Sequence, residues 1–205
     1  MTEELVQGSP EWVAARLGSF GASMLGALMA KGEGKTRAKL IDQLACERLS
    51  GKPQGWEGNS ATEAGHAQEP LARRAYGERH GVFVQQVGLI RHAALPFSHA
   101  SPDGLVDEDG GLELKSHVKF MTHFAAIQAG MSKAHVYQCQ WGMACTGRSW
   151  WDYGHFCAEA PEHMRLHMFP RIQRDETIIA TLAVAIRDAE VEVAAKVEQF
   201  SKRAA

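Results

Sequence analysis

Residues 101–115 constrain the fold more than any other stretch, because they predict two neighbouring strands and the turn that aligns them. Ser101-Pro102-Asp103-Gly104 predicts a tight turn, since proline presets its first central position and glycine relieves the exit. A strand should follow. Asp109-Gly110 then predicts a hairpin connection that returns the chain along a second strand over residues 112–115.

Side chains of this second strand divide between two faces. Alternation places Glu113 and Lys115 on one face and turns Leu112 and Leu114 toward a core. With a hairpin closing around residue 109, Asp103 is expected roughly opposite Lys115. Two carboxylates and an amine would then converge in one layer of side chains.

Such a constellation has a chemical use. Two acids at close range repel each other and are costly to keep ionised unless a divalent cation lies between them. The neighbouring lysine can orient a water molecule or help to deprotonate it for attack on a phosphodiester. Aspartate followed by Glu-x-Lys is the pattern of the PD-(D/E)xK nuclease superfamily. Taken alone, this stretch fits equally well a surface hairpin with a salt bridge on its face.

Length and composition limit the remaining choices. A chain of 205 residues with 45% hydrophobic content can bury a sizeable core, and we expect one domain over residues 1–205. The first residues lack the features of a signal peptide and no apolar run reaches membrane-spanning length, so a cytoplasmic protein without a membrane contact is expected. The four cysteines are expected to be reduced core residues. A net charge of −2 argues against a protein that coats nucleic acid through bulk electrostatics, so any DNA contact should come from a local basic surface.

Periodicity and end signals predict alternating helices and strands, hence an α/β fold with a mixed central sheet flanked by helices. Thr36 is expected to cap the third helix. The predicted helices cover residues 10–17, 24–30, 37–49, a segment beginning at Ser60, 120–129, 134–146 and 175–203. Further strands are predicted over residues 82–90, 150–157 and 164–169, the last pairing with the one before it.

The long C-terminal helix carries an apolar stripe of near-heptad spacing. We expect the stripe to pack on the sheet of this domain, with an oligomer contact as the alternative. Its members are Ile178, Leu182, Ile186, Ala189, Val193, Val197 and Phe200.

Short motifs follow one another in a fixed order between residues 12 and 140. They are Trp12-Val13-Ala14-Ala15-Arg16-Leu17-Gly18, Ala22-Ser23, Gly65-His66-Ala67-Gln68-Glu69, Ser101-Pro102-Asp103-Gly104-Leu105, Leu112-Glu113-Leu114-Lys115 and Gln138-Cys139-Gln140. Their order and spacing are far more specific than any one of them. In this combination the chain resembles the lambda exonuclease and YqaJ-like viral recombinase family of phage nucleases, within the PD-(D/E)xK superfamily.

The resemblance implies a metal site. Asp103 and Glu113 would hold the metal ions, and the Leu114 carbonyl would be a further ligand. Glu69, on its helix, would complete a second metal position. The implied cofactor is Mg²⁺ in a two-metal site, with Mn²⁺ as a substitute.

The resemblance also implies roles for residues around the metals. Lys115 would be the catalytic lysine, and Gln138 would lie near the attacking water. Arg16, Ser23 and Ser101 would form a pocket for the 5′-phosphate of a recessed DNA end.

Three residues of these motifs also fit a purely structural role, and one position departs from the family. Arg16 could cap the first helix or pair with Glu11, Trp12 fits a core residue better than a DNA contact, and Gln140 could face the helix exterior. A family member has an acidic residue ten positions before the turn aspartate. Here that position is Ala93, so any contribution made from there is missing.

The activity implied by the resemblance is Mg²⁺-dependent digestion of one strand of duplex DNA in the 5′ to 3′ direction. Mononucleotides and a 3′ single-stranded tail would result, and a ring-shaped homotrimer would pass this tail to a single-strand annealing protein. One alternative is an endonuclease or CRISPR-associated nuclease on the same core. Another is a DNA-end-binding protein without catalysis, against which the intact Asp103, Glu113 and Lys115 argue.

Overall fold

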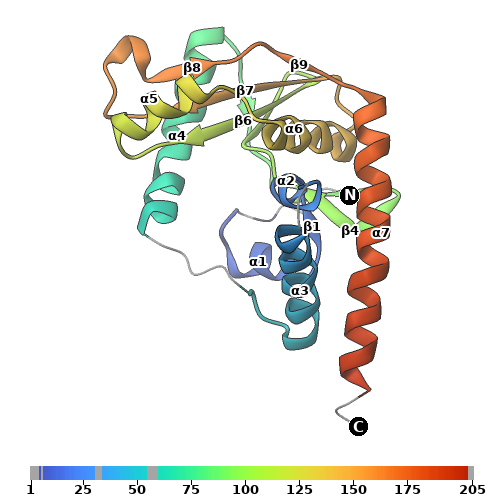
Figure 1. Ribbon diagram of the computed structural model, residues 1–205. Helices are drawn as coiled ribbons and strands as arrows, with labels where there is room; N and C mark the ends of the chain where they lie inside the picture. The colour runs from blue at the N-terminus through green and yellow to red at the C-terminus, as the bar shows by residue number, and fades with distance from the viewer. Residues whose placement is uncertain (1–4, 6, 31–33, 55–59, 203–205) are drawn as a thin grey trace.

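The computed structural model describes residues 5, 7–30, 34–54 and 60–202, and the side chains of residues 60–66 fall outside this description. Two β-sheets and the helices that cover them form a mixed α/β fold (Figure 1). The predicted class, a mixed sheet flanked by helices with a long C-terminal helix, is confirmed.

The N-terminal region consists of short elements. α1 (Pro10–Arg16) begins as predicted, because Ser9 caps it and accepts a hydrogen bond from the Trp12 N–H at 3.1 Å. The single helix expected over 24–30 is instead a 3-10 turn, η1 (Ala22–Met24), followed by the short α2 (Leu25–Leu28).

The third predicted helix begins two residues earlier than expected. It is α3 (Lys35–Ser50), and the prediction that Thr36 caps it was wrong. Gly34 is the cap residue instead. Its φ of 73° lies in the left-handed region that glycine adopts at no steric cost.

The strands form two sheets. Six strands make the larger one, in the order β2-β5-β6-β7-β8 with β9 also paired to β7, and the smaller one has the order β1-β4-β3. Their bounds are β1 (Phe20–Gly21), β2 (Val84–Gln85), β3 (Ile90–His92), β4 (Leu95–Ala100), β5 (Gly104–Val106), β6 (Gly110–Ser116), β7 (Trp150–Phe156), β8 (Leu166–Met168) and β9 (Ile172–Gln173). The predicted pairing of β8 with β7 is confirmed.

The single strand expected over residues 82–90 was wrong. This segment contains β2 and the start of β3, which belong to different sheets: β2 pairs with β5, whereas β3 pairs with β4. Residues 86–89 lie between the two strands and carry the chain from one sheet to the other.

The central strands β6 and β7 are parallel, and the predicted helices α5 (Phe120–Ala129) and α6 (Lys133–Thr146) form the crossover between them. Glycines and tryptophans fix their register. Gly111 pairs with Trp151, whose ring lies so close that an added Cβ would approach it to 2.2 Å. The absence of a side chain at residue 111 therefore makes room for the indole and penalises any shift of one strand along the other.

Helix α4 (Ser60–His80) crosses this sheet and is locked to β7 by a buried acid. The Tyr76 hydroxyl donates to Asp152 Oδ2 at 2.7 Å, and Arg171 donates to both oxygens of the same carboxylate at 2.8 and 2.9 Å. Pro70 is accommodated within the helix. Because Asp152 is buried, its paired partners hold the C-terminal half of α4 in one position over the sheet.

The last rung between β6 and β7 is made by a side chain of α4. The His117 N–H donates to the Phe156 carbonyl at 2.8 Å, and in a continuing parallel ladder the Ala158 N–H would donate to the His117 carbonyl. The Gln68 carboxamide lies between these two groups instead. Its Nε2 donates to the His117 carbonyl at 3.1 Å, and its Oε1 accepts from the Ala158 N–H at 3.1 Å. Helix α4 is thus joined to both strands one residue before Glu69.

The C-terminal helix α7 (Glu176–Ser201) begins after Asp175, which caps it. Its buried side chains pack mainly along α3 and α6 and only to a lesser extent on β4, so the expectation that the stripe packs on the sheet holds for this minor contact alone (Figure 1). The reason is that α7 runs beside α3 away from the sheet. Arg48 of α3 and Glu190 of α7 pair across the contact at 2.6 Å. The buried residues are Ile179, Leu182, Ile186, Ala189 and Val193.

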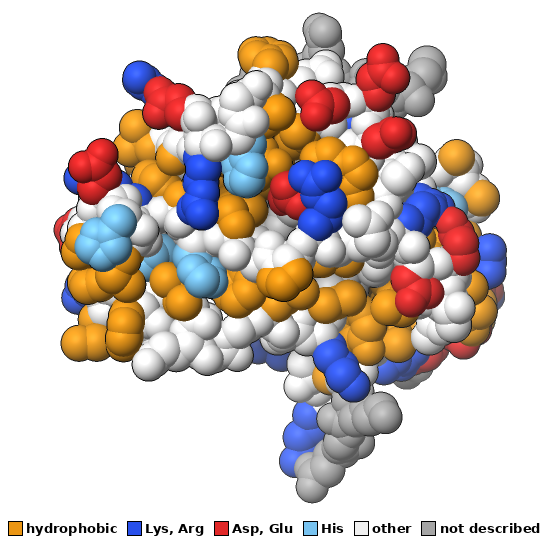
Figure 2. Space-filling model, turned by 90° about the horizontal axis from the view of Figure 1, so that it is seen from above, with side chains coloured by type: hydrophobic (Ala, Val, Ile, Leu, Met, Phe, Trp, Pro, Cys, Tyr) orange, Lys and Arg blue, Asp and Glu red, His pale blue; other side chains and the backbone are white. Residues whose placement is uncertain are grey.

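The surface shows no concentration of charge on the face seen in Figure 2, where acidic and basic side chains are interspersed among hydrophobic ones. No helix in the described ranges has the length and apolar character needed to cross a membrane. Cys139 and Cys157 are buried as expected, and Cys145 is partly buried. Cys46 is exposed, so the core assignment was wrong for that residue.

Candidate active site

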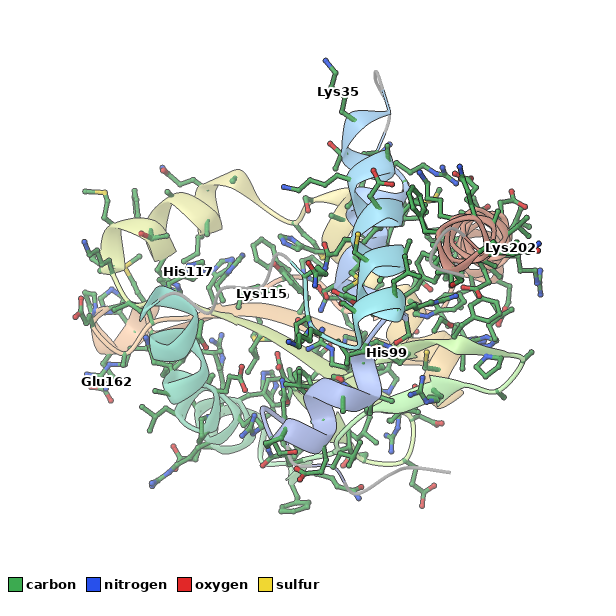
Figure 3. The ribbon with its side chains drawn as sticks, turned by 90° about the horizontal axis from the view of Figure 1, so that it is seen from below. Lys35, His99, Lys115, His117, Glu162 and Lys202 are labelled. Carbon is green, nitrogen blue, oxygen red and sulfur yellow. The ribbon has the colours of Figure 1, made fainter. Side chains whose placement is uncertain are left out.

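A cavity of about 590 Å³ lies where the central strands meet α1, η1 and the helices α4, α5 and α6. It brings together nearly all the residues that the sequence singled out. Figure 3 shows Lys115 and His117 close to each other, with His99 lying toward α1. The lining includes Trp12, Arg16, Gly21, Ser23, Glu69, His99, Ser101, Asp103, Glu113, Leu114, Lys115, His117, His135, Gln138 and His155.

The hairpin positions Asp103 beside Glu113. In the β5–β6 pair Gly104 lies opposite Leu112, and continuing this register by one residue places Asp103 opposite Glu113. The expectation that Asp103 lies opposite Lys115 was therefore wrong by two residues, because the hairpin is centred one residue before Asp109. Asp103 Oδ2 accepts a hydrogen bond from the Leu114 N–H at 2.6 Å, which anchors this carboxylate on β6.

Both carboxylates are buried: Asp103 is 7% exposed and Glu113 is 6% exposed. Burial, reinforced by the neighbouring Glu113, raises the pKa of Asp103 well above its usual value, although the Leu114 N–H and Lys115 oppose the shift. Two buried carboxylates side by side are the donor set that a hard divalent cation stabilises.

A backbone oxygen adds to this donor set. The side chain of Leu114 packs in the hydrophobic core, so its backbone is the part that lines the cavity. A residue's N–H and C=O point to the same edge of a strand, and the Leu114 N–H points to Asp103. The Leu114 carbonyl therefore faces the same edge, beyond the end of β5, and fits the role of a ligand.

Lys115 lies two residues after Glu113 on β6, and both side chains line the cavity. Its Nζ contacts Glu113 Oε1 at 2.6 Å and donates to Gln138 Oε1 at 3.1 Å. Burial lowers the pKa of Lys115, but the charge of Glu113 and its hydrogen bond outweigh this and raise it overall. The structure thus places the predicted lysine and Gln138 in one hydrogen-bonded group.

Glu69 projects from α4 toward the same cavity, where Arg73 lies 3.9 Å from its carboxylate. Its charge also contributes to the raised pKa of Asp103. Over the described part of the chain, no three His, Cys, Asp or Glu side chains are gathered closely enough to form a complete metal site as they stand. The fit to a cation therefore rests on Asp103 and Glu113, with Glu69 nearby. The side chain of His66, in the same motif, lies outside the described residues.

Arg16, Ser23 and Ser101, the residues predicted to bind a 5′-phosphate, all line the cavity. The Arg16 guanidinium lies over the Trp12 ring, 4.0 Å from its centroid, and the acid whose charge acts on it is Glu47, not Glu11. Burial lowers the pKa of Arg16, and Glu47 partly offsets this effect. The Ser101 hydroxyl is buried without a hydrogen-bond partner.

A cluster of histidines lies beside the acids, and no sequence motif points to it. His117 Nε2 lies 2.8 Å from His155 Nδ1, and His135 Nδ1 lies 2.9 Å from the Tyr153 hydroxyl. Burial, together with the surrounding histidines, lowers the pKa of His155 to about 3, so this ring is neutral at neutral pH. Tyr153 and His155 pair with Glu113 and Lys115, and only this register, which the sequence does not reveal, brings them to the site.

Two further residues named in the sequence analysis, Gln140 and Ala93, do not line the cavity. Gln140 does not face the helix exterior as expected: it is buried, donates to the Gln173 carbonyl at 2.8 Å and accepts from the Asp175 N–H at 2.9 Å. It therefore joins α6 to the start of α7. Ala93 lies in the exposed turn between β3 and β4 and is not among the residues that line the cavity.

Comparisons with known proteins agree with this geometry. The alkaline exonuclease LHK-Exo from Laribacter hongkongensis is 35% identical over 96% of this chain and 98% of its own, with a TM-score of 0.86. Its complex with dAMP matches with the same identity and coverage and a TM-score of 0.87. A phage-related exonuclease from Haemophilus somnus 129PT, 16% identical over 89% of this chain and 96% of its own, shares the fold with a TM-score of 0.77.

No curated protein matches the chain significantly. The family model described as the YqaJ-like viral recombinase domain matches residues 11–149, which contain the hairpin acids, Lys115, Glu69 and Gln138. The chain therefore belongs to the YqaJ-like viral recombinase family.

Proposed function

We propose that this protein is a Mg²⁺-dependent exonuclease that digests one strand of duplex DNA from the 5′ end and leaves a 3′ single-stranded tail. The observation that carries the proposal is the buried Asp103–Glu113 pair with Lys115 beside it in an open cavity. Two similarities support it: the 35% identity to an alkaline exonuclease, and the complex of that relative with dAMP. A deoxynucleoside monophosphate is the product expected when a strand is shortened one nucleotide at a time.

The residues divide into three roles. Asp103 and Glu113, with the Leu114 carbonyl and Glu69, would hold Mg²⁺, for which Mn²⁺ can substitute. When bound, the metal polarises the scissile phosphate and lowers the pKa of water. Lys115 orients the attacking water, since its ammonium group donates hydrogen bonds in the cavity. Gln138, whose Oε1 accepts one of them, fixes the direction of that ammonium group.

Polarity requires a feature that distinguishes a 5′ end from a 3′ end. Arg16 offers a forked, permanently charged donor that suits a phosphate, and Ser23 and Ser101 add hydroxyl donors to the lining of the same cavity. Each cut that leaves a new 5′-phosphate would renew the group that this pocket binds. The strand would therefore be drawn forward after each step.

Removing the guanidinium should reduce the preference for phosphorylated ends. We expect wild type to degrade linear duplex with a 5′-phosphate at least about tenfold faster than the same duplex with a 5′-hydroxyl, because a charge-assisted hydrogen bond contributes about 1.5–3 kcal/mol. Arg16→Ala should bring this ratio to about threefold or less. Release of end-labelled nucleotide measures both rates.

Arg74→Ala is the matched control, since Arg74 is exposed on α4 and pairs with Glu78 outside the cavity. It should keep the wild-type ratio. Equal rates on both ends in the wild type, or an undiminished ratio in the Arg16 variant, would show that end recognition lies elsewhere.

Assembly gives a separate test. We propose the ring-shaped homotrimer of the family, which would gather modest positive charge around a central channel although the chain is slightly acidic. Light scattering at micromolar concentration should report about three times the chain mass of 22.5 kDa. A monomer at that concentration would contradict the ring. The proposed partner, a single-strand annealing protein, would receive the 3′ tail.

A circular duplex separates the proposal from an endonuclease on the same core. An exonuclease that needs an end leaves covalently closed DNA intact and degrades it after linearisation. Cutting of the closed circle at a comparable rate would favour the endonuclease.

A further inference from the structure

His99 is a buried residue of the cavity wall to which the sequence assigned no role. It lies near the end of β4 and pairs with Gly21 of β1. Its side chain is 1% exposed and lines the cavity. Ser101 lies two residues further along and also lines the cavity, as expected from the alternation of side chains along an extended chain.

Hydrogen-bond partners determine which nitrogen of His99 carries the proton. The Ser19 hydroxyl lies 2.8 Å from the Arg16 carbonyl, which can only accept, so the single hydroxyl proton of Ser19 is donated there. The same Ser19 oxygen lies 2.9 Å from His99 Nδ1 and must therefore accept from it. Nδ1 carries the proton, and the lone pair of Nε2 is left.

That Nε2 atom is buried and has no hydrogen-bond partner. A buried polar atom without a partner costs about 1–3 kcal/mol, so its presence in a cavity wall indicates a group that it binds. The neighbouring Ser101 hydroxyl is unpartnered as well.

Gly21 shows how closely His99 approaches Arg16. A Cβ added at Gly21 would lie 3.2 Å from His99 Nε2 and 3.8 Å from Arg16 Nη2, so the two nitrogen atoms face one small space. The charged groups that act on the ring are Arg16 of α1 and Arg91 of β3. Burial first, and then these two cations, lower the pKa of His99 to about 3, which keeps the ring neutral. Arg16 gives this space a positive potential.

We propose that His99 is a further specificity-determining residue at the Arg16 end of the cavity, where its Nε2 donates a hydrogen bond to the terminal 5′-phosphate of the DNA after a change of tautomer that the Ser19 hydroxyl accommodates. The inference rests on the proposed function. It adds to the phosphate pocket the Nε2 atom of His99, which faces the ligand, and the Ser19 hydroxyl, which changes its hydrogen-bond partner when the ligand binds.

The exchange of hydrogen bonds keeps the number of protons constant. A phosphate oxygen accepts, so Nε2 must donate to it. The ring proton moves from Nδ1 to Nε2 by exchange with solvent, and the Ser19 hydroxyl turns from the Arg16 carbonyl to donate to Nδ1. Ser19 thus gives one hydrogen bond in either state, and the neutral ring gives one hydrogen bond in either state. No net proton is taken up.

Two replacements of His99 separate its two nitrogen atoms. In His99→Gln the amide nitrogen takes the place of Nε2 and keeps a donor toward the ligand. In His99→Asn the amide reaches only the place of Nδ1, which keeps a partner for Ser19 and loses the ligand-facing atom. Binding is measured by fluorescence anisotropy in EDTA, without cleavage, on blunt duplexes that end in a 5′-phosphate or a 5′-hydroxyl.

The expected readout is the ratio of the two dissociation constants. Wild type should favour the phosphorylated end by at least about tenfold, which corresponds to about 1.4 kcal/mol. His99→Gln should keep the ratio within about threefold of wild type, and His99→Asn should lower it to about threefold or less. Ring ¹⁵N shifts of His99 should also show the proton moving from Nδ1 to Nε2 when the phosphorylated duplex is added.

A second variant protects the test against a folding defect of His99→Asn. Gly21 has a φ of −78°, which alanine adopts without strain, so Gly21→Ala fills the space between His99 and Arg16 and leaves the backbone unchanged. It should lower the same ratio.

Each failure has a distinct meaning. A wild-type ratio near one overturns the phosphate pocket of the proposed function. A wild-type preference that persists in folded His99→Asn and Gly21→Ala overturns the role of His99 alone. Equal loss in the Asn and Gln variants overturns the donor role of Nε2, because only the Gln variant keeps a donor there.

Discussion

Replacing Lys115 with alanine is expected to reduce cleavage of linear duplex DNA by at least about 100-fold, since a group that positions or transfers a proton contributes about 10²–10⁴-fold to a rate. Lys115 lies within hydrogen-bonding distance of Glu113 and Gln138 and makes no contribution to the hydrophobic core. The folded structure should therefore persist. Release of nucleotide from end-labelled duplex in Mg²⁺ measures the effect.

The control for this variant is Lys202→Ala, which removes the same charge at the far end of α7, away from Lys115 (Figure 3). It should cleave like wild type. DNA-end binding by Lys115→Ala in EDTA should stay within about threefold of wild type. Cleavage by that variant within about tenfold of wild type would refute the catalytic assignment.

Neutralising one carboxylate of the buried pair should weaken metal binding. Outer-shell partners of metal ligands contribute about 10–100-fold to metal affinity, and the loss of a charged ligand should cost at least about tenfold. Asp103→Asn and Glu113→Gln test this with little change in shape. An asparagine oxygen can still accept the hydrogen bond from the Leu114 N–H, so the hairpin should remain intact. Calorimetric titration with Mn²⁺ measures the affinity without DNA.

Glu162→Gln is the matched control, since Glu162 is an exposed acid far from Lys115 in Figure 3. It should bind Mn²⁺ like wild type. Unchanged affinity in both carboxylate variants would mean that the cation, if one is needed, binds outside the pair.

Much of the site follows from local sequence. Asp103, Glu113 and Lys115 lie within 13 residues, and a short hairpin converges them almost regardless of the rest of the fold. Even there, the register predicted from the sequence is wrong by two residues, because the acidic turn can close in several ways that fit the same turn residues. The roles of Glu69 and Gln138 could be predicted only from the family resemblance, since nothing in the local sequence places α4 or α6 over β6.

Other parts of the molecule depend on contacts that no local pattern encodes. His99 and His155 reach the cavity through pairings between strands that are distant in sequence. The strand expected over 82–90 failed for a related reason: its apolar residues are shared between two sheets, and periodicity does not show which sheet a residue joins. The stripe of α7 was recognised from its spacing, but spacing does not identify the partner surface.

The Gln68 rung makes the position of α4 conditional on the sheet. The carboxamide can bridge the His117 carbonyl and the Ala158 N–H only when β6 and β7 are already aligned, whereas the pairing of the two strands over seven residues does not need the helix. The position of α4 therefore depends on the pairing of β6 with β7, whereas that pairing does not depend on α4. We expect that the two acids of the hairpin can meet before the crossover through α5 and α6 closes, whereas the Gln68 hydrogen bonds that hold α4 beside them require that crossover. A chain halted before that step would then lack Glu69 at the proposed metal site.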